Sequence, residues 1–225
     1  MDILYFLKSR TAFIRTFYVT AAFPFKERIR KIREQEDPFD DPPYSEDPEP
    51  PFLAEYTEAD ESLEVLGQLC LSMLSNTLHL FLVESVEEVH RRYDAGALAK
   101  AGIGRPSDSV PKAVFKKEGW IGGYRAYFRD TLEIDWQQAP CDLGRLEEIA
   151  LARNSLQHPG DITTLQVEHS ANHAAKFPEG YFSEGPTSWL GAPFLYVPEE
   201  KLLGAVNEVE GFCSWLWERQ FRRRG

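Results

Sequence analysis

The sequence predicts an all-α protein, a bundle of four to five helices joined by long loops. Apolar residues recur at three- and four-residue spacing through several long segments, which is the period of an amphipathic helix. Segments rich in proline and glycine separate them, as expected of loops. The 225 residues are 43% hydrophobic, enough to bury one core, so we expect a single domain over residues 1–225.

The first helix is expected over residues 2–33, where apolar side chains keep the helical period and Pro24 is expected to introduce a kink. The second half of this helix is basic. Residues 34–56 are rich in proline and acid, which disfavours both helix and strand. We interpret 34–56 as an extended connector on the surface, with a docking arm for a partner as the alternative.

The second helix is expected over residues 58–92, and its wide apolar stripe is typical of a core helix. Ser72, Asn76 and His79 lie at positions i, i+4 and i+7, which places them on one face. Two interpretations are open for these polar groups. They are satisfied at a helix or subunit interface, or Asn76 and His79 support the residues of an active site.

The second half of the chain predicts shorter helices and longer loops. Residues 93–117 form an irregular connector, and a helix follows over 118–133. The next helix runs from Leu143 to about Gln157, with Asp142 as its N-cap. Residues 159–197 are an irregular loop with one short strand at 162–167, and the last helix begins at Pro198.

Composition limits the classes of protein that fit. Three cysteines without a CxxC pair favour reduced thiols over a disulfide framework or a zinc site. Charged residues interrupt the apolar N-terminal stretch, and no long uncharged apolar run stands out. We therefore expect a cytoplasmic protein that has no export signal and does not span a membrane.

The net charge of -11 is unevenly distributed along the chain. Residues 34–64 hold thirteen of the 36 acidic residues and no basic one, so the rest of the chain has 25 basic and 23 acidic residues. Since the acid is concentrated in one segment, the remaining surface can still hold a basic cleft for nucleic acid.

One short segment carries recognisable chemistry: Arg153-Asn154-Ser155-Leu156-Gln157-His158, at the end of the predicted fourth helix. Cleavage of RNA by its own 2′-hydroxyl needs a proton acceptor, a proton donor and a cation that stabilises an anionic phosphorane. Histidine titrates near neutral pH, and arginine binds phosphate oxygens through paired hydrogen bonds. No metal or other cofactor is required by this chemistry.

The spacing of the motif raises a geometric problem. On a straight helix, side chains five residues apart point about 140° away from each other. Arg153 and His158 can therefore meet only if the helix end deforms at Pro159, or if a second chain completes the site.

An arginine, then Asn, Asp or His, then a histidine four to six residues after the arginine, at the end of a helix in a helical bundle, resembles the signature of the HEPN superfamily. The resemblance covers Arg153 to His158 closely and the helical plan loosely. It implies a HEPN-like domain and a metal-independent endoribonuclease of the toxin–antitoxin, abortive-infection or antiviral defence type. It also implies a homodimer, with Arg153 and His158 catalytic and Asn154 in support. Gly160 stands where some members carry a modifiable tyrosine, so that regulation is not implied.

Basic and aromatic residues before the motif are candidates for guiding RNA to it. They are Lys116, Lys117, Arg125, Arg129 and Trp120, with the indole available to stack on a base.

Other readings of the motif remain open. Arg153 could pair with Glu147 or Glu148, with His158 only capping the helix. The protein could be a non-catalytic helical dimer that binds RNA or a regulatory protein. It could also be an antitoxin or immunity component whose acidic 34–64 segment masks a basic surface. His169 and His173 have the i, i+4 spacing of metal ligands, but no third ligand is evident and we expect no metal site.

Overall fold

The computed structural model describes residues 2–41, 49–92, 112–157, 164–184 and 193–221. Most of these residues are helical and the only described strands are two residues long, which confirms the all-α prediction. In chain order the elements are α1 (Ile3–Glu34), α2 (Leu53–Arg92), α4 (Lys112–Leu132), the 3-10 turn η1 (Trp136–Gln138), α5 (Leu143–Gln157), α6 (Ala171–Lys176), β1 (Ser183–Glu184), β2 (Phe194–Leu195) and α7 (Glu199–Phe221).

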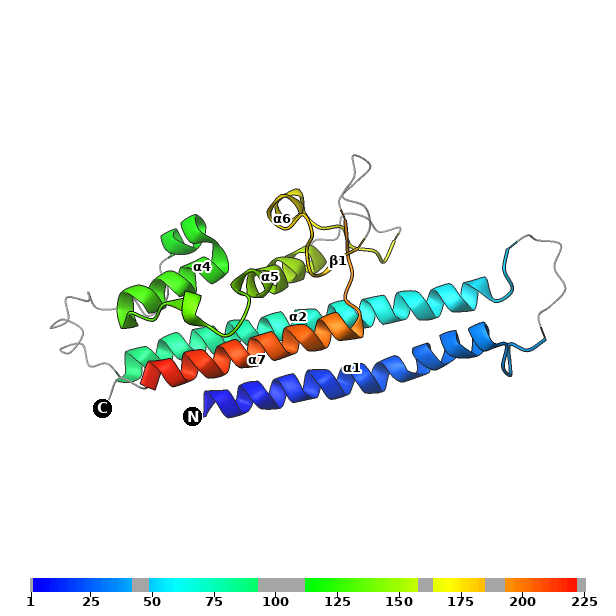
Figure 1. The fold of residues 1–225 in the computed structure, drawn as a ribbon, viewed down its shortest axis with the longest axis horizontal. Helices are drawn as coiled ribbons and strands as arrows, with labels where there is room; N and C mark the ends of the chain where they lie inside the picture. The colour runs from blue at the N-terminus through cyan, green and yellow to red at the C-terminus, as the bar shows by residue number, and fades with distance from the viewer. Residues whose placement is uncertain (1, 42–48, 93–111, 158–163, 185–192, 222–225) are drawn as a thin grey trace.

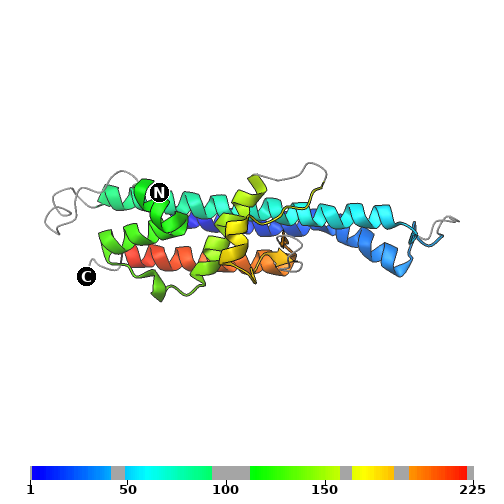
Figure 2. The ribbon, with the colours of Figure 1, turned by 90° about the horizontal axis from the view of Figure 1, so that it is seen from above.

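The helices form two layers. The long helices α1, α2 and α7 lie side by side along the molecule, with α2 and α7 antiparallel to α1 (Figure 1). The shorter α4, α5 and α6 cover one side of this layer, and the view from above shows α5 crossing the long helices instead of following them (Figure 2). One hydrophobic cluster includes buried residues from both layers, so the described helices share a core.

The first helix matches its prediction closely. Asp2 caps it by accepting a hydrogen bond from the Tyr5 backbone N–H at 3.0 Å. The helix continues through Pro24 and ends at Gln35, whose left-handed backbone lets its N–H reach the carbonyls of the last turn. One face is buried, but Phe6 and Phe17, which share the apolar period, are 52% and 38% exposed.

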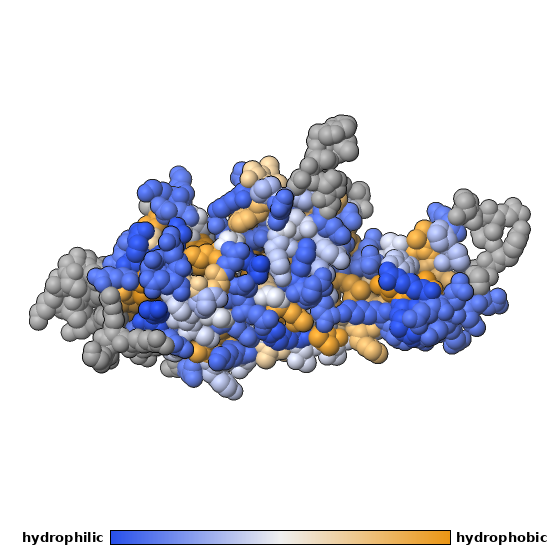
Figure 3. Space-filling model, in the orientation of Figure 1, coloured by the Kyte–Doolittle hydropathy of each residue, from blue (hydrophilic) through white to orange (hydrophobic). Residues whose placement is uncertain are grey.

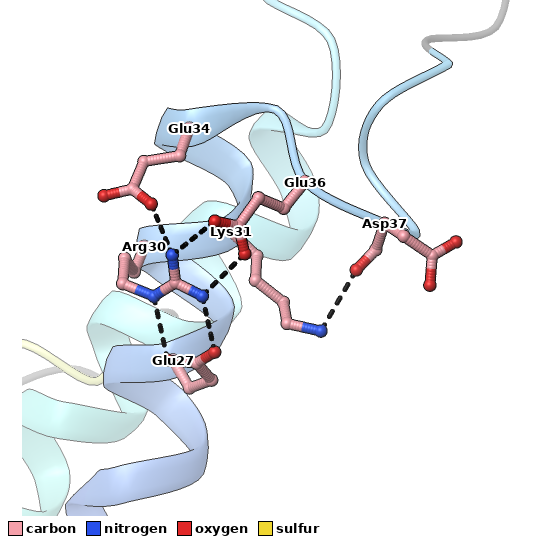
Figure 4. A network of polar contacts seen from close by, with 6 residues as sticks. All are labelled: Glu27, Arg30, Lys31, Glu34, Glu36 and Asp37. Carbon is pink, nitrogen blue, oxygen red and sulfur yellow. Dashed lines mark hydrogen bonds and ion pairs between the residues drawn. The ribbon is translucent and has the colours of Figure 1, made fainter.

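Acidic side chains neutralise the basic end of α1. Arg30 pairs with Glu27, Glu34 and Glu36 (Figure 4), and these hydrogen bonds raise the pKa of the Arg30 guanidinium. Arg28 pairs in the same way with Glu58 of α2. Figure 3 shows hydrophilic side chains gathered low at this end of the molecule, with hydrophobic residues above them. Acidic residues from the 34–64 segment, from α1 itself and from α7 (Lys26 with Glu199) therefore pair with the basic half of α1.

The second helix starts earlier than its sequence predicts. The connector was expected to reach residue 56, but α2 already begins at Leu53, directly after Phe52. Phe52 packs edge-on against Phe39 at 5.0 Å between ring centroids, and this contact holds the connector against the start of the helix. The two prolines at 50 and 51 precede the helix, where the lack of an N–H costs nothing.

By length and composition alone, the central helix α2 could cross a membrane, over Leu53–Arg91. Of the most apolar 18-residue stretch of this helix, 61% is buried inside the protein. The other long helices and α5 all pack against it. That burial is the pattern of a core helix, and localisation remains a prediction.

The structure corrects the start of the helix that was predicted over residues 118–133. The helical segment α4 begins at Lys112 and is kinked at Gly119, whose positive φ of 74° suits glycine. The kink folds the first turns back, so that Phe115 covers Gly123 and meets Tyr124 edge-on at 5.3 Å. A side chain at Gly123 would collide with the Phe115 ring, which explains why glycine occupies this position.

The long loop before α7 holds more structure than predicted. The strand expected at 162–167 is wrong over its described part, since residues 164–167 are not in a strand. The pairing instead joins Ser183 to Leu195 and Glu184 to Phe194, with an isolated bridge from Glu168 to Phe194. Between them α6 forms a short helix capped by Ser170. The sequence pattern is too short here to distinguish a strand from an extended loop.

We predict that alanine substitution of two helical glycines has opposite effects on the free energy of unfolding. A Cβ on Gly67 of α2 would lie 2.2 Å from the Val197 carbonyl oxygen, whereas a Cβ on Gly211 of α7 would meet nothing within 4 Å. Gly67→Ala should lower the free energy of unfolding by about 1–3 kcal/mol because backbone must move apart. Gly211→Ala should raise it by about 0.5–1 kcal/mol. Urea titrations of both variants measure this, and an equally stable Gly67→Ala protein would contradict the close approach.

Candidate functional site

The helix α5 presents the first part of the motif. It runs from Leu143 to Gln157 as predicted, and Asp142 caps it by accepting the Gly144 backbone N–H at 2.8 Å. Its apolar face is buried through Leu146, Ile149 and Ala152. Arg153 and Asn154 fall near its end. His158, with the remainder of the 158–163 segment, lies outside the described residues.

Arg153 and Asn154 open into a cavity of about 330 Å³ enclosed by α2, α4 and α5. Of the three polar residues that the sequence placed on one face of α2, Asn76 and His79 line the same cavity and Ser72 does not. Trp120 of α4 lines it as well. The full lining is Ser75, Asn76, His79, Gly119, Trp120, Ile121, Glu147, Ala150, Leu151, Arg153 and Asn154.

Three separate parts of the chain thus meet at one place. Asn76 and His79 were open to two interpretations, an interface or support for an active site. The structure places both beside Arg153, where they are exposed to the cavity instead of buried between helices. Glu147 and Ser75 were missed as lining residues, because neither belongs to a recognisable motif and only the crossing of α5 over α2 brings them in.

The His79 ring is held in a defined orientation. It stacks on the indole of Trp120, with 5.3 Å between ring centroids and 26° between the ring planes. Partial burial and the positive charge of Arg153 lower the pKa of His79 below its ordinary value of 6.5. Because the neutral form is favoured, this imidazole is a proton acceptor at neutral pH.

Among the described residues, Arg153 makes no ion pair with Glu147 or Glu148, the two partners expected for a purely structural role. Glu147 pairs instead with Lys176 at 2.5 Å, and Glu148 accepts the Phe182 backbone N–H at 2.9 Å. The Nε atom of Arg153 is buried and has no hydrogen-bond partner in the described part of the chain. A guanidinium that lines a cavity can bind an anion such as a phosphate group.

The four predicted RNA-contacting cations lie on α4 but outside the cavity lining. Lys116, Lys117, Arg125 and Arg129 are all exposed. Lys117 pairs with Glu118 at 3.3 Å and Arg129 with Asp130 at 2.8 Å, both at the surface. Such exposed pairs are weak, so these cations can exchange partners with a nucleic-acid backbone. Only Trp120 of the predicted RNA-contacting group lines the cavity, and His79 covers part of its ring.

A buried acid–histidine cluster supports α5 from the side of α6. Glu148, His169 and His173 are each no more than 3% exposed, and the two imidazoles lie 3.9 Å apart between centroids. Burial opposes ionisation of Glu148, but the nearby His173 and the backbone N–H groups of Phe182 and Tyr181 outweigh it and lower its pKa. Burial, with the charge of His173, lowers the pKa of His169 to about 4.

Neither this cluster nor any other in the described ranges gathers three or more His, Cys, Asp or Glu residues in a metal-binding arrangement. In this cluster, His169 directs its Nε2 to the Phe182 carbonyl oxygen at 3.2 Å. His173 Nε2 lies 3.8 Å from the nearer Glu148 oxygen. The histidine spacing that resembled a metal-ligand pair thus lies at the join between the loop and α5.

A larger cavity of about 560 Å³ lies between α1 and α2, but it lacks the chemistry of a catalytic site. Its lining is mainly apolar, with Arg10 and Glu84 its charged members. Arg10 is already engaged through a hydrogen bond to the Thr77 hydroxyl at 3.2 Å. No histidine lines this cavity, so the smaller one beside Arg153 is the candidate site.

Comparison with models of protein families, with curated proteins and with solved structures finds no match for this chain.

We predict that two adjacent glutamates on α5 differ in their contribution to stability. Glu148→Ala leaves buried N–H groups without an acceptor and should lower the free energy of unfolding by about 2–3 kcal/mol. Glu147→Ala removes a surface ion pair and should cost under about 1 kcal/mol. Urea titrations at pH 7 compare the two, and equal losses would contradict the assigned burial.

The lowered pKa of Glu148 predicts that the stability of the protein depends on pH. The pKa of Glu148 is lowered in the folded state, so its stabilising contribution is present above the unfolded value of about 4.5 and is lost as the pH falls through the lower folded pKa. Below pH 4.5 the difference in stability between wild type and Glu148→Ala should therefore shrink. A difference that stays constant from pH 7 to pH 3 would show that the carboxylate charge is not involved.

Proposed function

We propose that the protein is a metal-independent endoribonuclease similar to HEPN-type ribonucleases, acting as a toxin or defence effector. The observation that supports this most directly is the half-buried Arg153, which has no ion pair among the described residues and lines a cavity together with a histidine and an aromatic ring. A guanidinium in that position suits a phosphodiester better than it suits a neutral substrate.

The reaction we propose is attack of the 2′-oxygen on the adjacent phosphorus. Arg153 stabilises the charge that develops on the phosphorane oxygens. His158, the residue that follows the last residue of α5 in the sequence, donates a proton to the leaving 5′-oxygen. Asn154 orients the phosphate or a neighbouring side chain, because an amide donates and accepts hydrogen bonds but does not relay protons at neutral pH.

The proposal includes a homodimer, since one straight helix cannot direct both Arg153 and His158 inward. The dimer contact must lie near α5, because each copy has to bring its motif to the shared site. Phe6, Phe13 and Phe23 of α1 are 52%, 57% and 67% exposed, but α1 lies on the other side of the long helices from α5 (Figure 1), so this face does not join the two motifs.

We expect Arg153→Ala and His158→Ala each to lower RNA cleavage by about 100-fold or more, since each removes a group that acts on the transition state. Cleavage of total RNA and of transfer RNA is measured in EDTA, and the products should carry 2′,3′-cyclic phosphate and 5′-hydroxyl ends. Asn154→Ala should lose less. Both catalytic variants should keep the wild-type circular dichroism spectrum, because a helix-end substitution costs at most about 1–2 kcal/mol.

Arg28→Ala is the matched control, since it removes one arginine that is paired with Glu58 outside the cavity, and it should cleave like wild type. Mixing inactive Arg153→Ala and His158→Ala proteins should restore partial activity if two chains complete one site. If His158→Ala cleaves as well as wild type, or if cleavage requires an added divalent ion, the mechanism is wrong. A protein that binds RNA without cleaving it would fit the non-catalytic alternative.

We expect RNA to reach the cavity along α4, and a separate binding experiment tests this path. Lys116→Glu should weaken RNA binding and reduce the slope of log affinity against log salt by about 1, as loss of one phosphate contact requires. Arg28→Glu, which reverses a charge at the other end of the molecule, is the control. Affinity that responds neither to salt nor to Lys116→Glu would exclude this path.

A further inference from the structure

The candidate cavity contains a histidine that the motif does not include. His79 comes from α2, whereas Arg153 and Asn154 come from α5, and all three line the same 330 Å³ space. Of the described histidines, only His79 lines this cavity. His90 hydrogen-bonds with the Tyr127 hydroxyl at 3.2 Å, while His169 and His173 are buried elsewhere.

We infer that His79 is the general base of this site, accepting the proton of the attacking 2′-hydroxyl while Arg153 binds the phosphate next to it. The inference rests on the proposed function and adds a catalytic residue to it. In the balanced step, the proton moves from the 2′-oxygen to a ring nitrogen of His79. The new bond joins the 2′-oxygen to phosphorus, and the bond from phosphorus to the 5′-oxygen breaks. The leaving oxygen takes the proton that the proposed function assigns to His158.

The geometry of His79 suits a proton acceptor. Its ring is fixed against Trp120 through a near-parallel stack, so its orientation does not have to be found anew in each turnover. The residue is exposed and lines the cavity, so a substrate in the cavity can contact its ring. Asn76, one turn earlier on the same face of α2, can hold the substrate beside the ring through its amide.

The charges around His79 favour its neutral form. From α5, the cavity lining carries Arg153 and Glu147, and the carboxylate of Glu147 is paired with Lys176. From α4, the lining residues Gly119, Trp120 and Ile121 carry no charge, and from α2 neither Ser75 nor Asn76 ionises. Within the described ranges, Arg153 is therefore the lining charge without an ion-pair partner. Partial burial, together with this charge, lowers the pKa of His79.

His79 supplies the proton acceptor that the proposed reaction otherwise lacks. Attack by the 2′-hydroxyl needs a neutral base as well as the acid that protonates the leaving oxygen. The cation beside His79 favours its neutral imidazole, so this residue can take the proton at neutral pH.

The test is His79→Ala in the full-length protein, with His90→Ala as a matched control on the same helix. Cleavage of a short RNA should fall by about 100-fold or more in His79→Ala. The RNA affinity should change little, because the loss concerns proton transfer. Wild-type activity should rise through a midpoint below pH 6.5, and that acidic limb should disappear in His79→Ala. Added imidazole should restore part of the lost rate.

The possible results distinguish a failure of this inference from a failure of the proposed ribonuclease function. If wild-type protein cleaves no RNA, both fail. If wild type cleaves and His79→Ala keeps its rate and pH profile, the ribonuclease stands and His79 is not its base. If His79→Ala loses activity together with RNA binding, and imidazole restores nothing, the residue only shapes the cavity and the inference is overturned. His90→Ala should keep both its rate and its acidic limb.

Discussion

Packing against α2 is the constraint on which the rest of the structure depends. This helix spans Leu53–Arg92, and α1, α5 and α7 all contact it. Burial of its side chains on several sides leaves one narrow face uncovered, and Asn76 and His79 lie there. The cavity beside Asn76 and His79 forms where α5 crosses this face and brings Arg153 over it.

Electrostatics keep the acidic chain compatible with an anionic ligand. The net charge of -11 would repel RNA if it were spread evenly. Part of the acid is instead engaged at the basic end of α1, where Arg30 meets Glu27, Glu34 and Glu36. The α4 cations and Arg153 are on the other half of the chain. Acidic segment and candidate site are thus separated in the structure as well as in the sequence.

The two glutamates at 147 and 148 show how α5 connects two environments. Glu147 lines the cavity and pairs with Lys176 of α6, whereas Glu148 turns inward and binds the backbone at Phe182. Both contacts tie the loop before α7 to the helix that carries Arg153. These contacts involve two glutamates that the motif itself does not contain.

The sequence by itself determined the helices and the residues of the motif. Period and capping act over a few neighbouring residues, so the span of α5, its Asp142 cap and the place of Arg153 near its end could all be read locally. The same local information erred at Leu53 and at Lys112, where short proline-rich and glycine-containing stretches leave the boundary to packing. The sequence pattern also predicted the short strand before α7 at the wrong residues, because a strand of two residues is too short to show an alternation of apolar and polar side chains.

Only the tertiary structure decided which side chains share the cavity. His79, Trp120 and Arg153 belong to three helices, and no local pattern specifies their distance from one another. Their meeting follows from the crossing of α5 over α2 and from the Gly119 kink in α4, which are properties of side-chain packing across the whole core. Histidine and arginine in the sequence indicate which chemistry is available. The fold alone determines that an arginine sits close enough to lower the pKa of a particular histidine.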